Sequence, residues 1–333
     1  MINQPIIPKI MAGITGKNFP RILQIIKTLS YADLVNMVFL LILSIISIIF
    51  SSKIYLWPVL TLCNILLIFL IGFIVYKYES KPATEKEMRS FPITFSRILR
   101  FWYGVPLIIY FFKQVYLIIN LINAPLCDSM LIKIDLAVFG VNPTQWIFRF
   151  ENPLITEILQ IIYLIYYLII IVYGLELYLW KRYDEFKFAT LVLFLGFYLC
   201  YLAYMVFPAV GPRFYLHNFS SINSEMPGLF LTDWIRQFLN FAESIPQNVP
   251  NPQDYVQRDA MPSAHAEIAI LLAYLSKRIR SRSFYFYLPY CILMIISTIY
   301  LRYHYAIDII AGGLMAVVTI MLAVVINRRQ RKI

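Results

Sequence analysis

The first pattern that could carry chemistry pairs a histidine with a carboxylate near the end of the chain. His304 and Asp308 are four residues apart, so on a helix they would share one face. A carboxylate bound to one imidazole nitrogen fixes the tautomer and makes the other nitrogen a better nucleophile. The spacing therefore predicts a nucleophilic histidine, and a plain polar contact between helices is the alternative.

A second histidine closes the segment Met261-Pro-Ser-Ala-His265. Pro262 suits the first turn of a helix, where free backbone N–H groups form a site for anions. In this position His265 could donate a proton to a leaving oxygen, and Ser263 could add a hydrogen bond. The alternative is an ordinary Pro-Ser helix start with a histidine beside it.

An arginine follows two prolines and a glycine in the segment Phe207-Pro-Ala-Val-Gly-Pro-Arg213. The prolines and the glycine would end a helix and stiffen the exit of the chain. The planar guanidinium of Arg213 suits a phosphate because it donates paired hydrogen bonds. An anchor at the membrane interface is the alternative. The third histidine, His217, is not expected to be essential.

The composition identifies the kind of protein that must position these residues. Of the 333 residues, 60% are hydrophobic and 14% charged, whereas soluble domains average about 45–50% apolar and about 25% charged residues. This excludes an ordinary cytosolic enzyme, a disordered chain and a secreted disulfide scaffold, and indicates an integral membrane protein. The four cysteines are widely separated, so neither a disulfide framework nor a metal site is expected. No cleavable signal peptide is evident at the N-terminus.

Eight apolar segments predict about eight transmembrane helices and an all-α fold. Two of the eight are imperfect, because one contains Lys113 and another is short and contains Glu267. In chain order the predicted spans are Leu34–Phe50, Leu56–Tyr76, Phe101–Ile122, Ile158–Leu175, Phe188–Phe207, Ala264–Ser276, Phe284–Leu301 and Ile309–Asn327.

The basic residues predict the direction of these spans. With a cytoplasmic N-terminus, 21 of the 29 Lys and Arg residues fall in the inner segments. Both termini are therefore expected in the cytoplasm, and the net charge of +11 is a topology signal that does not imply a nucleic-acid partner. All three motifs then fall on the outer side, which is periplasmic, extracellular or lumenal. Two long outer connections, 123–153 and 208–261, are expected to contain short helices at Leu131–Phe139, Trp146–Phe150 and Leu229–Phe241, the last of them amphipathic.

Together these motifs resemble the type 2 phosphatidic acid phosphatase superfamily, most closely its membrane branch containing inositol phosphorylceramide synthase. The resemblance covers roughly residues 100–327 and implies a six-helix catalytic core preceded by two additional helices. It implies that His304 attacks phosphorus to form a phosphohistidine, that Asp308 orients His304, and that His265 protonates the leaving alkoxide. It also implies that Arg213 and Ser263 bind the phosphate oxygens.

Three departures from the superfamily pattern change the expected set of phosphate ligands. Val206 stands near the place of the first-motif Lys, Ala264 replaces the second-motif Gly, and Thr298 replaces the third-motif Arg. Arg302 and Arg258 are candidate replacements for the missing cations. On a continuous helix, however, Arg302 would point away from His304, so it can serve only if the chain breaks there.

The sequence thus predicts a membrane enzyme with three parts: residues 1–99, the catalytic core 100–327 and a basic tail 328–333. It would cleave or transfer a phosphate ester of a phospholipid, sphingolipid or polyprenyl phosphate at the outer face of the lipid bilayer, without a cofactor or metal. Water as acceptor makes it a phosphatase, and an alcohol such as inositol or a sugar makes it a phosphotransferase. The alternative is a non-catalytic lipid-binding protein or transporter that retains the fold.

Overall fold

A computed structural model describes residues 28–79, 91–247 and 249–330 of the chain. Within these ranges the secondary structure is entirely helical and contains no strand, as the sequence predicts. Parts of the predicted N-terminal segment, basic loop and tail lie outside the described residues. These parts are residues 1–27, 80–90 and 331–333.

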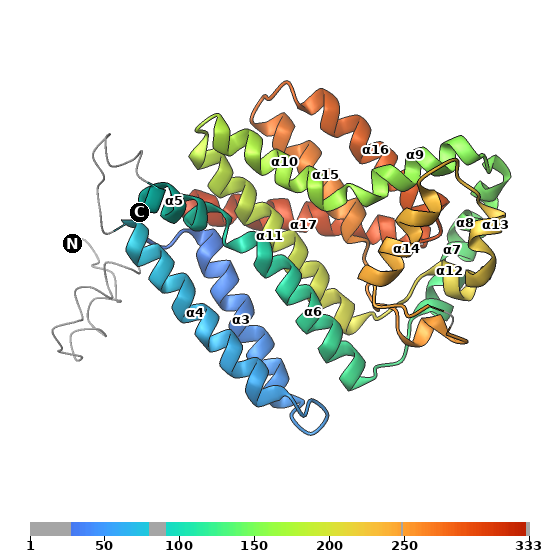
Figure 1. Cartoon of the computed structure of the whole chain (residues 1–333), viewed down its shortest axis with the longest axis horizontal. Coiled ribbons are helices and arrows are strands. Elements are labelled where there is room, and N and C mark those ends of the chain that lie inside the picture. The colour runs from blue at the N-terminus through green and yellow to red at the C-terminus, as the bar shows by residue number, and fades with distance from the viewer. Residues whose placement is uncertain (1–27, 80–90, 248, 331–333) are drawn as a thin grey trace, which may run out of the picture.

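Ten helices form the body of the molecule (Figure 1). They are α3 (Tyr31–Ile49), α4 (Trp57–Glu79), α5 (Phe91–Trp102), α6 (Gly104–Ile122), α9 (Pro153–Leu164), α10 (Tyr166–Leu179), α11 (Tyr183–Val206), α15 (Ala264–Arg278), α16 (Phe284–Tyr300) and α17 (Ala306–Gln330). The other described helices occupy the two long connections. They are α7 (Asp128–Phe139), α8 (Pro143–Ile147), η2 (Phe148–Phe150), α12 (Pro212–Tyr215), η3 (Phe219–Ser221), α13 (Ile222–Glu225), α14 (Thr232–Ala242) and η4 (Pro252–Asp254).

The number of membrane-spanning helices is lower than the sequence predicts. In the described residues five helices, α3, α4, α6, α11 and α17, are long and apolar enough to cross a bilayer. The pair α9 and α10 makes a sixth if it is counted as one span, although it bends by 53° at its break. The other two predicted spans are helical but short, with 15 residues in α15 and 17 in α16. At 1.5 Å per residue they are about 22 and 26 Å long, less than the ~30 Å hydrocarbon core. The prediction of eight full spans is therefore corrected to five or six.

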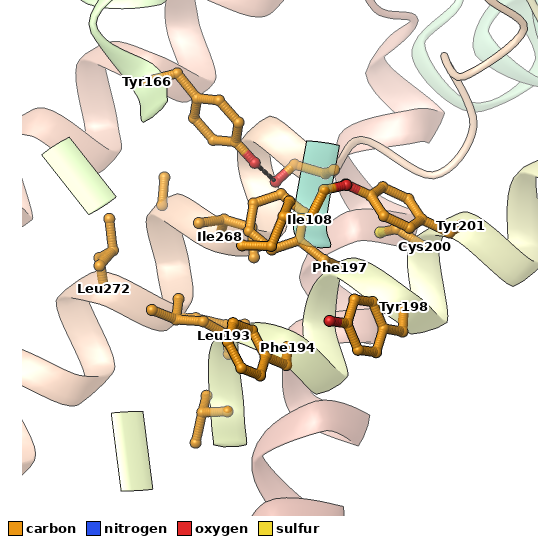
Figure 2. Close-up of a cluster of buried hydrophobic side chains, with 14 of the residues drawn as sticks. Ile108, Tyr166, Leu193, Phe194, Phe197, Tyr198, Cys200, Tyr201, Ile268 and Leu272 are labelled. Carbon is orange, nitrogen blue, oxygen red and sulfur yellow. Dashed lines mark hydrogen bonds between the residues drawn. The ribbon is translucent and has the colours of Figure 1, made fainter. Parts of the chain in front are cut away.

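Helix α11 is the centre of the bundle and contacts α3, α6, α10, α15 and α17. In the most apolar stretch of α11, 61% of the residues are buried within the protein, compared with 22% in α4. Figure 2 shows part of the resulting core, which includes Phe197, Tyr198 and Tyr201 of α11 and Ile268 of α15. Because neighbouring helices or lipid surround α11, an apolar sequence without a polar stripe suits it.

Polar contacts add to the apolar packing that attaches the hairpin of α3 and α4 to this bundle. The amide of Asn64 on α4 donates to Ser44 of α3 at 3.1 Å and accepts from the hydroxyl of Tyr110 on α6 at 2.7 Å. At the other end of α3, Asp33 accepts two hydrogen bonds from Arg100 of α5, at 2.9 and 2.7 Å. Most large side chains of α4 are exposed, as expected for a helix that faces lipid.

The short helices of both long connections gather at one end of the molecule (Figure 1). The three helical segments predicted within these connections are all found, as α7, as the end of α8 with η2, and as α14. Helix α14 has two unlike faces: Arg236 is buried, whereas Trp234, Phe238 and Phe241 are exposed. Its start is held by Glu157 of α9, whose carboxylate accepts from the backbone N–H groups of residues 229, 231 and 232.

Candidate active site

A break between α16 and α17 places His304 outside a helix. The backbone N–H groups of residues 303 and 304 both donate to the carbonyl of Thr298, and Arg302 adopts a left-handed conformation with φ of 66°. Helix α17 starts only at Ala306. His304 and Asp308 therefore do not share a helical face as the spacing suggested. They approach because the loop folds back over the first turn of α17.

The two ring nitrogens of His304 have different surroundings. Nδ1 lies 2.8 Å from the carbonyl oxygen of Ala260 and 3.6 Å from Oδ2 of Asp308. A carbonyl can only accept, so Nδ1 carries the proton and Nε2 keeps its lone pair. Asp308 instead accepts from the backbone N–H of Tyr305 at 2.9 Å. Burial lowers the pKa of His304 to about 4, although the nearby Asp259 acts in the opposite direction.

His265 faces the free nitrogen of His304. Its Nδ1 lies 3.3 Å from Nε2 of His304. Tyr163 stacks on the His265 ring with centroids 4.5 Å apart, and Tyr166 contacts it at 4.4 Å. These two tyrosines flank the break between α9 and α10, so the bend of that helix pair places both rings around His265.

Ser263 fixes the start of α15 against α17. Its hydroxyl accepts from the backbone N–H of Ala266 at 3.3 Å, and its own N–H donates to the carbonyl of Asp308 at 3.0 Å. A side chain at Gly312 would place its Cβ 2.5 Å from the carbonyl oxygen of Ser263. Glycine at this position therefore allows the two helix starts, with His265 and Asp308, to come together.

Arg213 joins the site through a column of rings. Tyr163 stacks on Tyr303 with centroids 4.2 Å apart, and the guanidinium of Arg213 lies 4.6 Å from the Tyr303 ring. Arg213 is buried and forms an ion pair with Glu243. Its Nε has no hydrogen-bond partner among the described residues. The structure thus brings two histidines, one carboxylate, one serine and one arginine to the same end of the bundle.

Comparison with known proteins identifies the family. A model of the PAP2 superfamily matches residues 130–322, which is more than half of the chain and includes every one of these groups. The chain belongs to the PAP2 superfamily. No curated protein and no solved structure matches it. Membership implies a phosphatase-like enzyme that acts on phosphate esters.

The other two arginines predicted for phosphate binding have side-chain partners of their own in this PAP2 protein. Arg302 is buried, but its guanidinium donates to Glu225 at 2.5 Å and lies 4.8 Å from the Phe148 ring. Arg258 reaches toward the side chain of Asn123, 3.5 Å away. The chain does break at Arg302, as its role in phosphate binding would require, and the Arg302 side chain forms an ion pair with Glu225.

Two aspartates of α7 support the PAP2 site and were not singled out as site residues from the sequence. Asp128 accepts from the backbone N–H of Gly211 at 2.9 Å and from the hydroxyl of Tyr305 at 2.9 Å. Asp135 accepts from the first two N–H groups of α17, at 2.9 and 2.8 Å. Burial raises the pKa of both carboxyls, and these hydrogen bonds act against the rise. The sequence could have indicated them, because both aspartates lie in an apolar segment, and a carboxylate that is buried there needs hydrogen-bond partners.

Gly211 makes the close approach of the two loops possible. Its φ of 97° and ψ of 164° belong to a region that only glycine occupies readily. A Cβ at this position would also lie 2.5 Å from the carbonyl oxygen of Tyr303. Two residues later, the backbone N–H of Arg213 donates to the carbonyl of Arg302 at 3.1 Å. The motif that carries Arg213 is thereby joined to the loop that carries His304.

Proposed function

We propose that this chain is a membrane enzyme that cleaves or transfers a lipid phosphate ester through a phosphohistidine on His304. The observation that carries the proposal is the 3.3 Å contact between Nε2 of His304 and Nδ1 of His265. This contact places at one site a nucleophile and a proton donor, the two groups that exchange of a phosphate ester bond requires. The PAP2 match supports the class of substrate but not its identity.

In the first step Nε2 of His304 attacks phosphorus, and the bond between phosphorus and the ester oxygen breaks. The electron pair goes to the leaving oxygen, which takes a proton from His265. The carbonyl of Ala260 and the carboxylate of Asp308 stabilise the Nδ1–H side of His304 as its ring becomes positively charged. In the second step the acceptor hydroxyl gives its proton to His265 and its oxygen bonds to phosphorus, which releases His304.

The phosphate oxygens would be held by Arg213 and by the start of α15 at Ser263. Arg213 must then exchange Glu243 for the phosphate, and its unpartnered Nε is a further donor. Arg302 contributes through its backbone, which fixes the loop before His304. We assign Arg258 no direct contact with phosphate, because its side chain is directed toward Asn123. This leaves Arg213 as the main phosphate-binding cation.

An apolar cavity supports a lipid as the substrate. It has a volume of about 80 Å³ between α6, α10 and α11, and Tyr167 is part of its lining. Tyr167 follows Tyr166, whose ring contacts His265. We propose that a substrate with its phosphate at His304 places part of an acyl or prenyl chain in this cavity. We also propose, from the basic residues of the sequence, that the site lies at the outer bilayer face.

The acceptor decides between a phosphatase and a phosphotransferase. The resemblance to the synthase branch favours transfer to an alcohol such as inositol. The long connections that surround the site have room for an acceptor as well as for a lid. The domain division at residue 100 fits this proposal, because the superfamily match lies inside the proposed core.

Activity of the purified full-length protein tests the proposal. Phosphatidic acid, a ceramide phosphate ester and a polyprenyl diphosphate are each supplied with and without inositol, and phosphate release and lipid products are measured. We expect turnover by the wild type and none by His304→Ala. His217→Ala is the matched control and should keep its activity, since His217 contacts Thr144 instead of His304. If neither wild type nor His304→Ala turns over any substrate, the non-catalytic alternative replaces the enzyme.

A further inference from the structure

A second cavity lies beside Arg213, between α14 and the loop that precedes His304. Its volume of about 310 Å³ is at the lower end of the ~300–1,000 Å³ found for small-molecule sites. Its wall is polar over much of its area. The polar residues in this wall are Arg213, Ser220, Asn223, Arg236, Asn240 and Tyr303.

Arg236 is the unexplained member of this wall. Its side chain is 5% exposed. One terminal nitrogen, Nη1, lies 3.1 Å from the amide oxygen of Asn223. The other, Nη2, is buried and has no hydrogen-bond partner among the described residues. Leaving a buried guanidinium nitrogen without an acceptor is costly.

Arg236 also forms no ion pair among the described residues. No carboxylate oxygen of the described residues lies within 4.0 Å of it. Asp233, one turn earlier on α14, is exposed. The other buried arginines in the described part of the chain all have such a partner. These pairs are Arg100 with Asp33, Arg213 with Glu243 and Arg302 with Glu225.

Tyr303 connects this cavity to the catalytic groups. Its ring lies beneath the guanidinium of Arg213 and stacks on Tyr163, which stacks on His265 in turn. Arg213 and Arg236 line this one cavity, and of the two only Arg213 forms an ion pair with a described carboxylate. An anion beside Arg236 would supply both the missing acceptor and the missing negative charge.

We propose that the Arg236 cavity is a second anion subsite, which binds a second phosphate group of the substrate, as in a diphosphate ester. Arg213 binds the phosphate that His304 attacks, and Arg236 binds its neighbour. The inference rests on the proposed function for the first phosphate only. Binding at Arg236 itself involves no bond making or breaking.

Affinity for phosphonates that the enzyme cannot hydrolyse tests the subsite apart from catalysis. Methylenediphosphonate carries two linked anionic groups and methylphosphonate carries one. Both are titrated calorimetrically into the full-length protein in detergent. For the wild type we expect the diphosphonate to bind roughly tenfold more tightly or better, since a guanidinium–phosphonate contact is charge-assisted. In Arg236→Gln the ratio of the two affinities should fall to about threefold or less.

Two further variants keep the test decisive if Arg236→Gln does not fold. Asn240→Asp nearly preserves the side-chain size but adds a negative charge to the cavity wall, so it should weaken the diphosphonate more than the monophosphonate. Arg149→Gln removes an exposed arginine that contacts Trp146, and it should leave the ratio unchanged.

The subsite is overturned if the ratio of diphosphonate affinity to methylphosphonate affinity is the same in the wild type, Arg236→Gln and Asn240→Asp, even if the enzyme is active. A ratio that depends on Arg236 in a protein that turns over no substrate supports the subsite and overturns the proposed reaction. Inorganic phosphate is titrated as a third ligand. If it binds with the affinity and Arg236 dependence of the diphosphonate, the cavity takes free phosphate, and the assignment to a second substrate phosphate fails.

Discussion

At the scale of single residues, the two ring nitrogens of His304 have different roles in the proposed reaction. Nδ1 is held by its neighbours, and Nε2 is the nitrogen that would attack phosphorus. The carbonyl of Ala260 holds Nδ1 at 2.8 Å, whereas the carboxylate of Asp308 is farther away at 3.6 Å. A carbonyl fixes the tautomer without adding a full negative charge. The carboxylate adds that charge at a distance, where it acts mainly on the positively charged ring. The orientation assigned to Asp308 by the resemblance is therefore shared with a backbone group that no motif contains.

The depressed pKa of His304 predicts the acid limit of the proposed reaction. Protonation removes the lone pair of Nε2, and burial lowers this pKa from 6.5 to about 4. The imidazole thus stays neutral as the pH falls through 6.5, and kcat/KM should fall only as the pH approaches 4. A profile of kcat/KM against pH, corrected for titration of the substrate itself, measures this limit. An acid limb near pH 6.5 would contradict the assignment.

The lowered pKa of His304 also affects the stability of the fold, so the pH profile of activity needs a control for unfolding. Between pH 6.5 and about 4 the unfolded chain binds a proton at His304 that the folded chain excludes. Folding therefore becomes less favourable as the pH drops through this window. Activity regained on return to pH 7 separates reversible protonation from unfolding.

At the scale of elements, the site depends on two loops that are joined through Gly211. Gly211→Ala introduces a conformation that L residues avoid and a clash with the carbonyl of Tyr303. We expect it to destabilise the protein by roughly 2–4 kcal/mol and to lower activity. Thermal unfolding in detergent measures the loss.

Gly140→Ala is the matched comparison for this substitution. Gly140 also has a positive φ, of 70°, but nothing lies within 4 Å of its would-be Cβ. Gly140→Ala should therefore lower the free energy of unfolding by only about 1 kcal/mol. Equal losses for both variants would show that the contact with Tyr303 does not hold the loops together.

The sequence predicted elements better than it predicted their connections. His265, His304 and Asp308 were recognisable because each lies beside an apolar segment and matches a spaced motif. The direction of Arg302 was not predictable, since it depends on one left-handed residue in a loop. The break between α9 and α10 falls at Ile165, where neither proline nor glycine marks it. Ala260 and Arg236 act through tertiary contacts, which leave no local pattern.

At the scale of the whole molecule, orientation is the main prediction that the fold leaves to experiment. The basic residues predict cytoplasmic termini and an outer site. Asp254 is exposed at the site end, and Lys277 is exposed at the other end of α15. In intact cells a membrane-impermeant thiol reagent should label Asp254→Cys, whereas Lys277→Cys should react only after lysis. The reverse pattern would place the site in the cytoplasm.

The number of membrane-spanning helices could not be predicted from hydrophobic composition alone. Eight apolar segments are visible in the sequence, but α15 and α16 are shorter than a bilayer core is thick. Helix α15 is also largely buried by its neighbours. Apolar residues in a protein interior and apolar residues in lipid give the same signal along the chain, so hydropathy cannot separate them.

The polar contacts of Asn64 have a consequence for the lipid-facing helix α4. Hydrocarbon side chains gain little by exchanging a lipid neighbour for a protein neighbour, so they leave the rotation of such a helix about its own axis nearly undetermined. The amide of Asn64, held between Ser44 and Tyr110, selects one setting of that rotation. Many apolar residues of α4 should therefore tolerate exchange for other apolar residues. Replacing Asn64 should instead loosen the rotational setting that turns one face of α4 toward the bundle.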